Sequence, residues 1–390
     1  MTIDRSAEQP FVRYRALLDA HHAALDAGWS DDAFVDLVLR LDDAVDTVEG
    51  RGFRRTPLVA APALADATGA EAVWVKDDTG NVAGSHKARH LFGVLLHLAV
   101  SGDPGDDGPL AIASCGNAAL AAGVVARARG RPLRVFVPTW ADPGILGRLE
   151  DLDAAIEVCE RRAGESGDPA YLRFIEAVEN GATPFSVQGT MTPTTIDGGR
   201  TLGWEAAEQL ADREVGGRVR VFLQIGGGAM ATAVIDALTG AVERGWLDLD
   251  PVYHPVQTEA CAPLARAWDR AMDAAGADDP AAVDPATIDE LAEAFAAEPG
   301  RFMEPWEPVG DSAATGILDD VAYDWVPVVE ATLRSGGRPV VVPEGVVGTA
   351  HRLGRERTGI DAGPTGTAGL AGLLALDTPD PALLFFTGRT

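Results

Sequence analysis

Short apolar runs alternate along this chain with alanine-rich helical stretches, and this alternation limits the fold more than any other feature. Short, mostly apolar runs of this length are typical of strands that are buried on both faces. The runs that we interpret as buried strands are Ala72–Val75, Leu110–Ala113, Leu133–Val137, Val219–Ile225, Val340–Val342 and Leu383–Phe386. Strands that alternate with helices predict an α/β fold built from open, mostly parallel sheets.

Two helical segments lie outside this alternation. Residues 11–48 carry apolar side chains at helical spacing and are interrupted at residues 28–31, where Ser30 is suited to cap a second helix. We therefore expect an N-terminal helical hairpin over residues 1–50. Further on, Asp284 and Pro285 provide a cap and a first-turn proline for a short amphipathic helix.

Composition excludes several classes of protein. The chain has 390 residues, 32 Lys and Arg against 59 Asp and Glu, and a formal net charge of −27. The length favours two domains, and the charge argues against nucleic acid or an anionic membrane surface as a partner. No apolar stretch approaches the roughly 20 residues of a membrane span, and no leader is evident, so we expect a cytoplasmic protein. The three scattered cysteines predict neither a disulfide framework nor a zinc site.

Only two of the basic residues are lysines, Lys76 and Lys87, so any lysine chemistry has two candidates. Lys76 ends an apolar run, and we expect it to pair with Asp77 or Asp78. Lys87 follows a polar loop and opens a helix, whose positive end disfavours an ammonium ion. That environment favours the neutral amine that imine chemistry requires, although a surface lysine at a helix start is the alternative interpretation.

Three further turns follow predicted strands, which is where open α/β sheets bind ligands. The first, Ser114-Cys115-Gly116-Asn117, has small residues whose N–H groups can approach an anion or a ring. The second, Gly226-Gly227-Gly228-Ala229, opens a helix and suits a phosphate. It lacks the Gly-Lys-Ser/Thr ending of a Walker loop and departs from G-x-G-x-x-G, and a nucleotide-binding Rossmann domain remains an alternative. The third delivers the hydroxyl of Thr387.

Taken in order, these segments resemble the tryptophan synthase β-type superfamily of pyridoxal phosphate (PLP) enzymes, or fold type II. They are most similar to its threonine synthase and threonine/serine dehydratase branch. The segments that carry the resemblance are Arg55-Thr56-Pro57-Leu58 (R-T-P-L), Val75-Lys76-Asp77-Asp78 (V-K-x-E), Gly84-Ser85-His86-Lys87 (G-S-F-K), Ser114-Cys115-Gly116-Asn117 (S-x-G-N), Asp197–Gln209 (E-G-x-x-T-x-x-x-E-x-x-x-Q), Gly226-Gly227-Gly228 (the glycine-rich loop), 364–372 (P-x-S-A-x-x-A-G) and Thr387-Gly388 (T-G).

The resemblance implies a role for each matching residue. Lys87 would hold PLP as a Schiff base and later shuttle the Cα proton, with His86 beside the cofactor. Asn117 would hydrogen-bond the 3′ oxygen of PLP, and Thr387 would face its pyridine nitrogen. The residues that would bind the cofactor phosphate are Gly226, Gly227, Gly228 and Ala229. The residues that would receive the substrate carboxylate are Ser114, Cys115 and Gly116.

Two positions depart from the pattern of that branch. His86 replaces Phe, as it does in tryptophan synthase β chains, and Cys115 stands where Ser or Thr is usual. Cys115 is either a small residue that fills a tight turn or a nucleophile. His86 and His90 could face one side of a helix as metal ligands, but no third ligand is evident, and we predict no metal site.

The resemblance implies a PLP-dependent lyase or synthase that acts at Cβ of a small, serine- or threonine-like amino acid. The reaction would be β-elimination or β-replacement through an aminoacrylate-type intermediate. One alternative is a threonine synthase-type γ-replacement on O-phosphohomoserine, which the Asp197–Gln209 segment and Thr387 favour. Against it, Lys87-Ala88-Arg89 departs from the K-D-R of threonine synthases. Another alternative is a regulatory member that binds PLP without turnover.

The resemblance also implies an architecture. A larger domain would comprise residues 51–94 and 191–390, and a smaller mobile domain would comprise residues 95–190. PLP would lie in the cleft between them, and the chain would form a homodimer.

Overall fold

The computed structural model describes residues 3–102, 108–165 and 167–389. The chain divides into two compact units. The first unit comprises Met1–Arg55 and Gly80–Thr201, and the second comprises Thr56–Thr79 and Leu202–Thr390.

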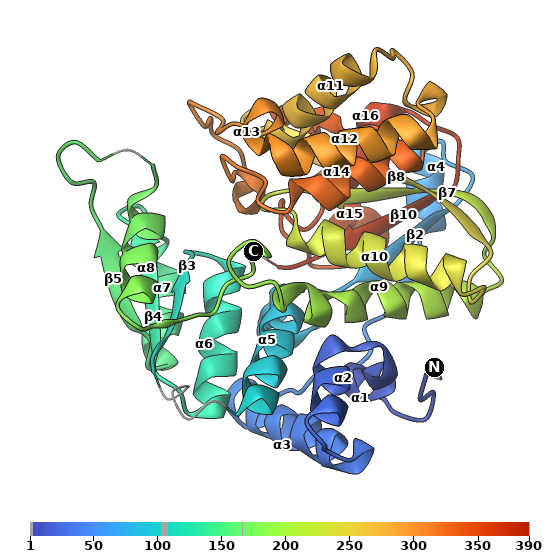
Figure 1. The fold of residues 1–390 in the computed structure, drawn as a ribbon. Coiled ribbons are helices and arrows are strands. Elements are labelled where there is room, and N and C mark those ends of the chain that lie inside the picture. The colour runs from blue at the N-terminus through green and yellow to red at the C-terminus, as the bar shows by residue number, and fades with distance from the viewer. Residues whose placement is uncertain (1–2, 103–107, 166, 390) are drawn as a thin grey trace. The chain divides into compact units, whose positions relative to one another are not determined.

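The second unit is built on a six-stranded sheet with the order β1-β2-β10-β7-β8-β9 (Figure 1). Its strands are β1 (Leu58–Ala60), β2 (Val73–Asp77), β7 (Gly217–Gln224), β8 (Leu249–Thr258), β9 (Val340–Val342) and β10 (Ala382–Phe386). Strand β1 is antiparallel to β2, and the other neighbours are parallel. Strand β10, the last along the chain, therefore lies between β2 and β7.

Both faces of this sheet are buried, which explains why its strands are mostly apolar. Val221 and Leu383 belong to one hydrophobic core, whereas Phe222 and Leu384 belong to another on the opposite face. The helices of this unit are α4 (Pro62–Thr68), α10 (Ala229–Glu243), α11 (Pro263–Ala275), α12 (Pro285–Ala297), α13 (Pro299–Phe302), α14 (Trp325–Arg334), α15 (Glu344–Thr358) and α16 (Ala368–Leu376), with 3-10 turns η3 (Pro280–Ala282) and η4 (Thr315–Ile317). Helices α10, α11, α12 and α14 cover the first face, and α4, α15 and α16 cover the second.

The first unit contains a four-stranded parallel sheet with the order β5-β4-β3-β6. Its strands are β3 (Leu110–Ala113), β4 (Leu133–Pro138), β5 (Ala155–Cys159) and β6 (Thr183–Pro184). Its helices include α5 (Lys87–Ser101), α6 (Asn117–Arg129), α7 (Pro143–Asp151) and α8 (Pro169–Glu179), while α9 (Thr195–Ala211) has residues in both units. Two mostly parallel sheets confirm the predicted α/β class.

The N-terminal helices agree with the expected hairpin in one arm and differ in the other. They are α1 (Pro10–Arg13), the 3-10 turn η1 (Arg15–Leu17), α2 (Asp19–Asp26) and α3 (Asp31–Glu49). Ser30 caps α3 as predicted, since its Oγ accepts from the Ala33 N–H at 3.1 Å. The first arm is broken because the Asp197 carboxylate accepts the N–H groups of Asp19 and Ala20, which starts α2 anew.

All six predicted strands are confirmed, as β2, β3, β4, β7, β9 and β10, but β8 was missed because it contains Pro251 and Pro255. Strand β9 pairs with β8 only over Val256–Thr258. The earlier residues of β8 therefore have no strand neighbour on the β9 side, where the missing N–H groups of the two prolines are tolerated. The short strands β1, β5 and β6 were also missed.

The two units group residues 80–94 and 191–201 with the smaller sheet, whereas we expected them in the larger domain. The expected domain limits concern which parts of the chain move together, which a grouping by contacts does not test. They stay a prediction. None of the helices in the described ranges combines the length and the apolar character that crossing a bilayer requires.

Helices α5 and α9 cross closely in the first unit because each has a glycine at the contact. A Cβ atom added to Gly198 would lie 2.8 Å from Gly93 Cα and closer still to the carbonyl oxygen of Arg89. Neither obstacle is the end of a flexible side chain, so a side chain at Gly198 must push the backbones apart.

We predict that Gly198→Ala lowers the free energy of unfolding by about 2 kcal/mol or more, because the added methyl has no space. Gly147→Ala in α7 is the matched control, since its Cβ would meet nothing within 4 Å. That change should leave stability equal or slightly higher, as alanine favours helix. Equal stabilities of the two variants, measured by denaturant unfolding, would contradict the close crossing.

Candidate functional site

Lys87 is the first residue of α5, which confirms the predicted helix start. It follows the 3-10 turn η2 (Val82–Gly84), in which Ala83 has a positive φ of 53°. The Asn81 side chain donates from Nδ2 to the Ser85 carbonyl at 2.9 Å and so fixes the turn that leads to Lys87. Positive φ is uncommon for alanine and is often found at functional sites.

His86 and His90 lie beside Lys87, and their rings meet edge to face with centroids 5.8 Å apart. His90 Nδ1 forms a hydrogen bond of 2.8 Å with the Thr195 carbonyl oxygen. Burial, and then the charge of Lys87, lower the pKa of His90 to about 3, so its ring is neutral at physiological pH. Among the described residues, no group of three or more His, Cys, Asp or Glu could hold a metal ion.

The Ser114-Cys115-Gly116 turn joins β3 to α6, and Asn117 is the first residue of α6. The Ser114 N–H donates to the Phe136 carbonyl at 3.2 Å, which ties the turn to the neighbouring strand β4. Cys115 is partly exposed. Helix α6 packs against both α5 and η2, so the Lys87 and Asn117 segments are neighbours in the first unit.

The glycine loop lies in the second unit, between β7 and α10. Gly228 has φ of 101°, a conformation that side chains disfavour. A Cβ atom at Gly226 would lie 2.9 Å from the Gly316 carbonyl oxygen and closer still to Asp319 Oδ2, and one at Gly227 would lie 3.1 Å from the Tyr323 ring. The loop therefore has no room for side chains, and the first-turn N–H groups of α10 lack intrahelical acceptors.

Thr387 directly follows β10 and is 2% exposed, as expected for a residue held at the end of a sheet strand. Its Oγ1 accepts a hydrogen bond of 2.9 Å from Gln224 Nε2, at the end of β7. We gave Gln224 no role from the sequence. The available signal was an amide residue between the apolar residues Leu223 and Ile225, two positions before the glycine loop.

Lys76 pairs with Glu205, whereas we expected a partner in Asp77 or Asp78. Its Nζ donates to Glu205 Oε2 at 2.7 Å, to the Thr56 carbonyl at 2.6 Å and to Gln209 Oε1 at 3.0 Å. Successive side chains of a strand point to opposite faces, so Asp77 cannot share the side of Lys76. Lys76 and Glu205 are both fully buried, and this lysine is a structural residue.

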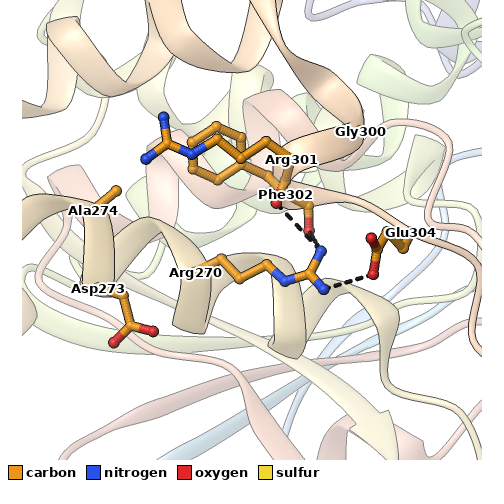
Figure 2. A pocket seen from close by; sticks show the side chains of 7 residues that line it. All are labelled: Arg270, Asp273, Ala274, Gly300, Arg301, Phe302 and Glu304. Carbon is orange, nitrogen blue, oxygen red and sulfur yellow. Dashed lines mark hydrogen bonds and ion pairs between the residues drawn. The ribbon is translucent and has the colours of Figure 1, made fainter.

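A cavity of about 470 Å³ lies elsewhere in the second unit, near α11 and α13 (Figure 2). Its lining residues are Arg270, Asp273, Ala274, Gly300, Arg301, Phe302 and Glu304. Arg270 points its guanidinium at the backbone carbonyls of Arg301 and Phe302 and at Glu304, so its donors are already engaged. None of the predicted site residues lines this cavity.

Comparison with known families shows which family the chain belongs to. Residues 50–388 match the family described as "Pyridoxal-phosphate dependent enzyme". The chain belongs to this family. Its cofactor is pyridoxal 5′-phosphate, and the alternative of a nucleotide-binding Rossmann domain is excluded.

Among individual relatives, the chain is similar to a threonine synthase of Methanosarcina acetivorans, with 27% identity over 54% of this chain and 49% of the relative. It is also similar to a serine dehydratase-like protein of Rattus norvegicus, with 29% identity over 52% of this chain and 57% of the relative. The chain thus matches about half the length of these curated relatives.

A solved structure of the T.th. threonine deaminase resembles the present one with a TM-score of 0.65 and 20% identity. The alignment covers 90% of this chain and 97% of that chain. At this identity the likeness establishes the fold.

The residues present fit pyridoxal phosphate at two places. Ser85 Oγ, two residues before Lys87, is buried and has no hydrogen-bond partner among the described residues, so it can serve a bound group. The glycine loop offers backbone N–H groups and the positive end of α10, a 15-residue helix, to a phosphate. The loop excludes side chains that would obstruct such a group.

His90 predicts a pH dependence of stability. Its pKa of about 3 in the folded chain lies below the ordinary 6.5, so it stabilises the fold above pH 6.5, and this contribution is lost as the pH falls toward 3. When the pH is lowered from 7 to 5, the free energy of unfolding should therefore fall by roughly 2 kcal/mol less in His90→Asn than in the wild type. Denaturant unfolding at the two pH values measures this difference.

The same substitution at His22, a half-exposed residue of α2, controls for the change itself. If His90→Asn and the wild type lose equal stability over this range, the buried neutral ring does not govern the acid response.

Proposed function

We propose that this chain is a PLP-dependent lyase or synthase that eliminates or replaces the β-substituent of a small amino acid of the serine or threonine type. The observation that carries the proposal concerns the two lysines. Lys76 is committed to a buried ion pair with Glu205. Lys87 is therefore the lysine that can hold the cofactor and act as a base.

Bound pyridoxal phosphate supplies an electron sink that acidifies the Cα proton of an attached amino acid. The amine of Lys87 would hold the cofactor and would be the base that takes this proton from Cα. The neutral ring of His90, one turn further along α5, adds no positive charge at this position. Ser114, Cys115 and Gly116 receive the substrate carboxylate.

The remaining residues orient the cofactor. Asn117 hydrogen-bonds its 3′ oxygen, and His86 adjoins it. Gly226, Gly227, Gly228 and Ala229 bind its phosphate, and Thr387 faces the pyridine nitrogen. A hydroxyl at that position, unlike a carboxylate, leaves the nitrogen largely unprotonated, which favours prompt loss of a β-substituent.

The main alternative is a γ-replacement of the threonine synthase type, and the similarity to the archaeal threonine synthase supports it. The segment Asp197–Gln209 lends it less support than the sequence suggested. Asp197 accepts from the start of α2 and from His97, and Gln209 binds Lys76 and the Thr56 carbonyl. These side chains therefore have structural tasks within the chain.

We also propose that the chain works in the cytoplasm as a homodimer. Cys115, Cys159 and Cys261 form no disulfide within the described residues, which agrees with a reducing compartment. Light scattering of the purified protein tests the dimer, and a monomer would contradict it.

The reaction is tested by incubating the PLP-loaded protein separately with serine, threonine, O-acetylserine and O-phosphohomoserine. The visible spectrum, released ammonia, phosphate and oxo acid are followed in each mixture. Oxo acid with ammonia from serine or threonine indicates elimination, whereas a new amino acid from O-acetylserine indicates replacement. Phosphate from O-phosphohomoserine alone selects the alternative, and binding of PLP with no product from any of them indicates a regulatory member.

We predict that borohydride reduction of the loaded protein attaches the pyridoxyl group to Lys87 and leaves Lys76 unmodified. Peptide mass spectrometry distinguishes the two sites, because the chain has no other lysine. Lys87→Ala should abolish the attachment. Lys76→Met, the matched control, should retain it while lowering stability, because Glu205 is left as an unpaired buried charge. A pyridoxyl group on Lys76 would overturn the anchor.

A further inference from the structure

Gln224 lies where the carboxyl ends of β7 and β10 meet. Its side chain is 6% exposed, and Nε2 is within hydrogen-bond distance of three backbone carbonyl oxygens and one hydroxyl. The acceptors are Phe385 O at 3.0 Å, Gly366 O at 3.1 Å, Thr365 O at 3.3 Å and Thr387 Oγ1 at 2.9 Å. The shortest of these contacts is the one to Thr387.

The surroundings determine which way the amide points. An amide oxygen in the position of Nε2 would face three carbonyl oxygens, all of them acceptors, and would be repelled. The nitrogen must therefore occupy this position. Because an amide nitrogen only donates, Thr387 Oγ1 is the acceptor in its contact with Gln224.

This contact determines how the Thr387 hydroxyl can act. With a lone pair of its oxygen occupied by Gln224, the hydroxyl directs its own proton away from the amide. The amide nitrogen has two hydrogens, so the second is left for the carbonyl oxygens, of which Phe385 O at 3.0 Å is the nearest. Gln224 thus presents Thr387 as a donor.

We propose that Gln224 is a positioning residue that holds the Thr387 hydroxyl as a hydrogen-bond donor to the pyridine nitrogen of the cofactor. The inference rests on the proposed function, in which Thr387 faces that nitrogen. Gln224 also belongs to the strand that continues into Gly226–Gly228. One strand therefore supports the contacts to both the phosphate and the ring nitrogen.

The test uses a double-mutant cycle of Gln224→Met and Thr387→Val, with two readouts other than activity. The first is the dissociation constant of PLP, and the second is the ¹⁵N chemical shift of PLP labelled at its ring nitrogen. In Gln224→Met the backbone carbonyls beside Thr387 lose the amide N–H groups that they accept from. We expect the Thr387 hydroxyl to donate its proton to one of these carbonyls instead. We expect PLP binding about three- to tenfold weaker, the range for one hydrogen bond, and a ¹⁵N shift moved to that of Thr387→Val.

In the Thr387→Val background, Gln224→Met should change neither quantity further, because no hydroxyl remains to be oriented. Equal losses of affinity in both backgrounds, or a ¹⁵N shift unchanged in Gln224→Met, would show a structural residue and overturn the proposal. Gln257→Met is the matched control, since Gln257 is a buried glutamine of the neighbouring strand β8 that accepts from the Leu264 and Ala265 N–H groups. It should lose stability and keep the wild-type ¹⁵N shift.

If Gln224→Met does not fold, Gln224→Glu replaces it, because a glutamic acid donates only when it is protonated. The ¹⁵N shift should then depend on pH in this variant and not in Gln257→Met. If neither variant folds while Gln257→Met does, Gln224 is structural and the proposal fails. A wild-type chain that binds no PLP refutes the proposed function itself. If the wild type binds PLP normally but the effects of Gln224→Met and Thr387→Val simply add, only the role of Gln224 is refuted.

Discussion

The buried pair of Lys76 and Glu205 is the interaction on which the second unit depends. The ammonium group has three hydrogens and three acceptors, on Thr56, Glu205 and Gln209, and Glu205 also accepts from the N–H and hydroxyl of Thr56. Strand β2, the segment before β1 and the later part of α9 are thereby joined in one fully bonded cluster. Such a cluster specifies a unique arrangement, because loss of any member leaves a charge or polar group buried without compensation.

The class of fold could be predicted because its strands are buried on both faces and read as apolar runs. Strand β8 could not, because its prolines are permitted only by the limited reach of β9, which is a property of the assembled sheet. The break before α2 was missed for a similar reason. It depends on Asp197, a residue 178 positions from Asp19 in the sequence.

The candidate site divides in the same way. The places of Lys87, Asn117 and the glycine loop at helix starts could be predicted because each follows an irregular segment and opens a helix, a pattern that sequence alone displays. The partner of Lys76 could not be found, because alternation along β2 directs Lys76 and Asp77 to opposite faces and the true partner lies on α9. Gln224 was visible as an amide within an apolar strand, but only its four acceptors explain it.

The position of β10 has a consequence for how the chain reaches its native state. Residues 382–386 form the strand between β2 and β7, so during synthesis both neighbours are made long before their common partner. Until then β2 and β7 each present an unpaired edge, and the apolar faces of the sheet are incomplete. Folding of the second unit is therefore expected to be slow, because the sheet cannot close before β10 is made, and chaperones would protect the open edges in the meantime.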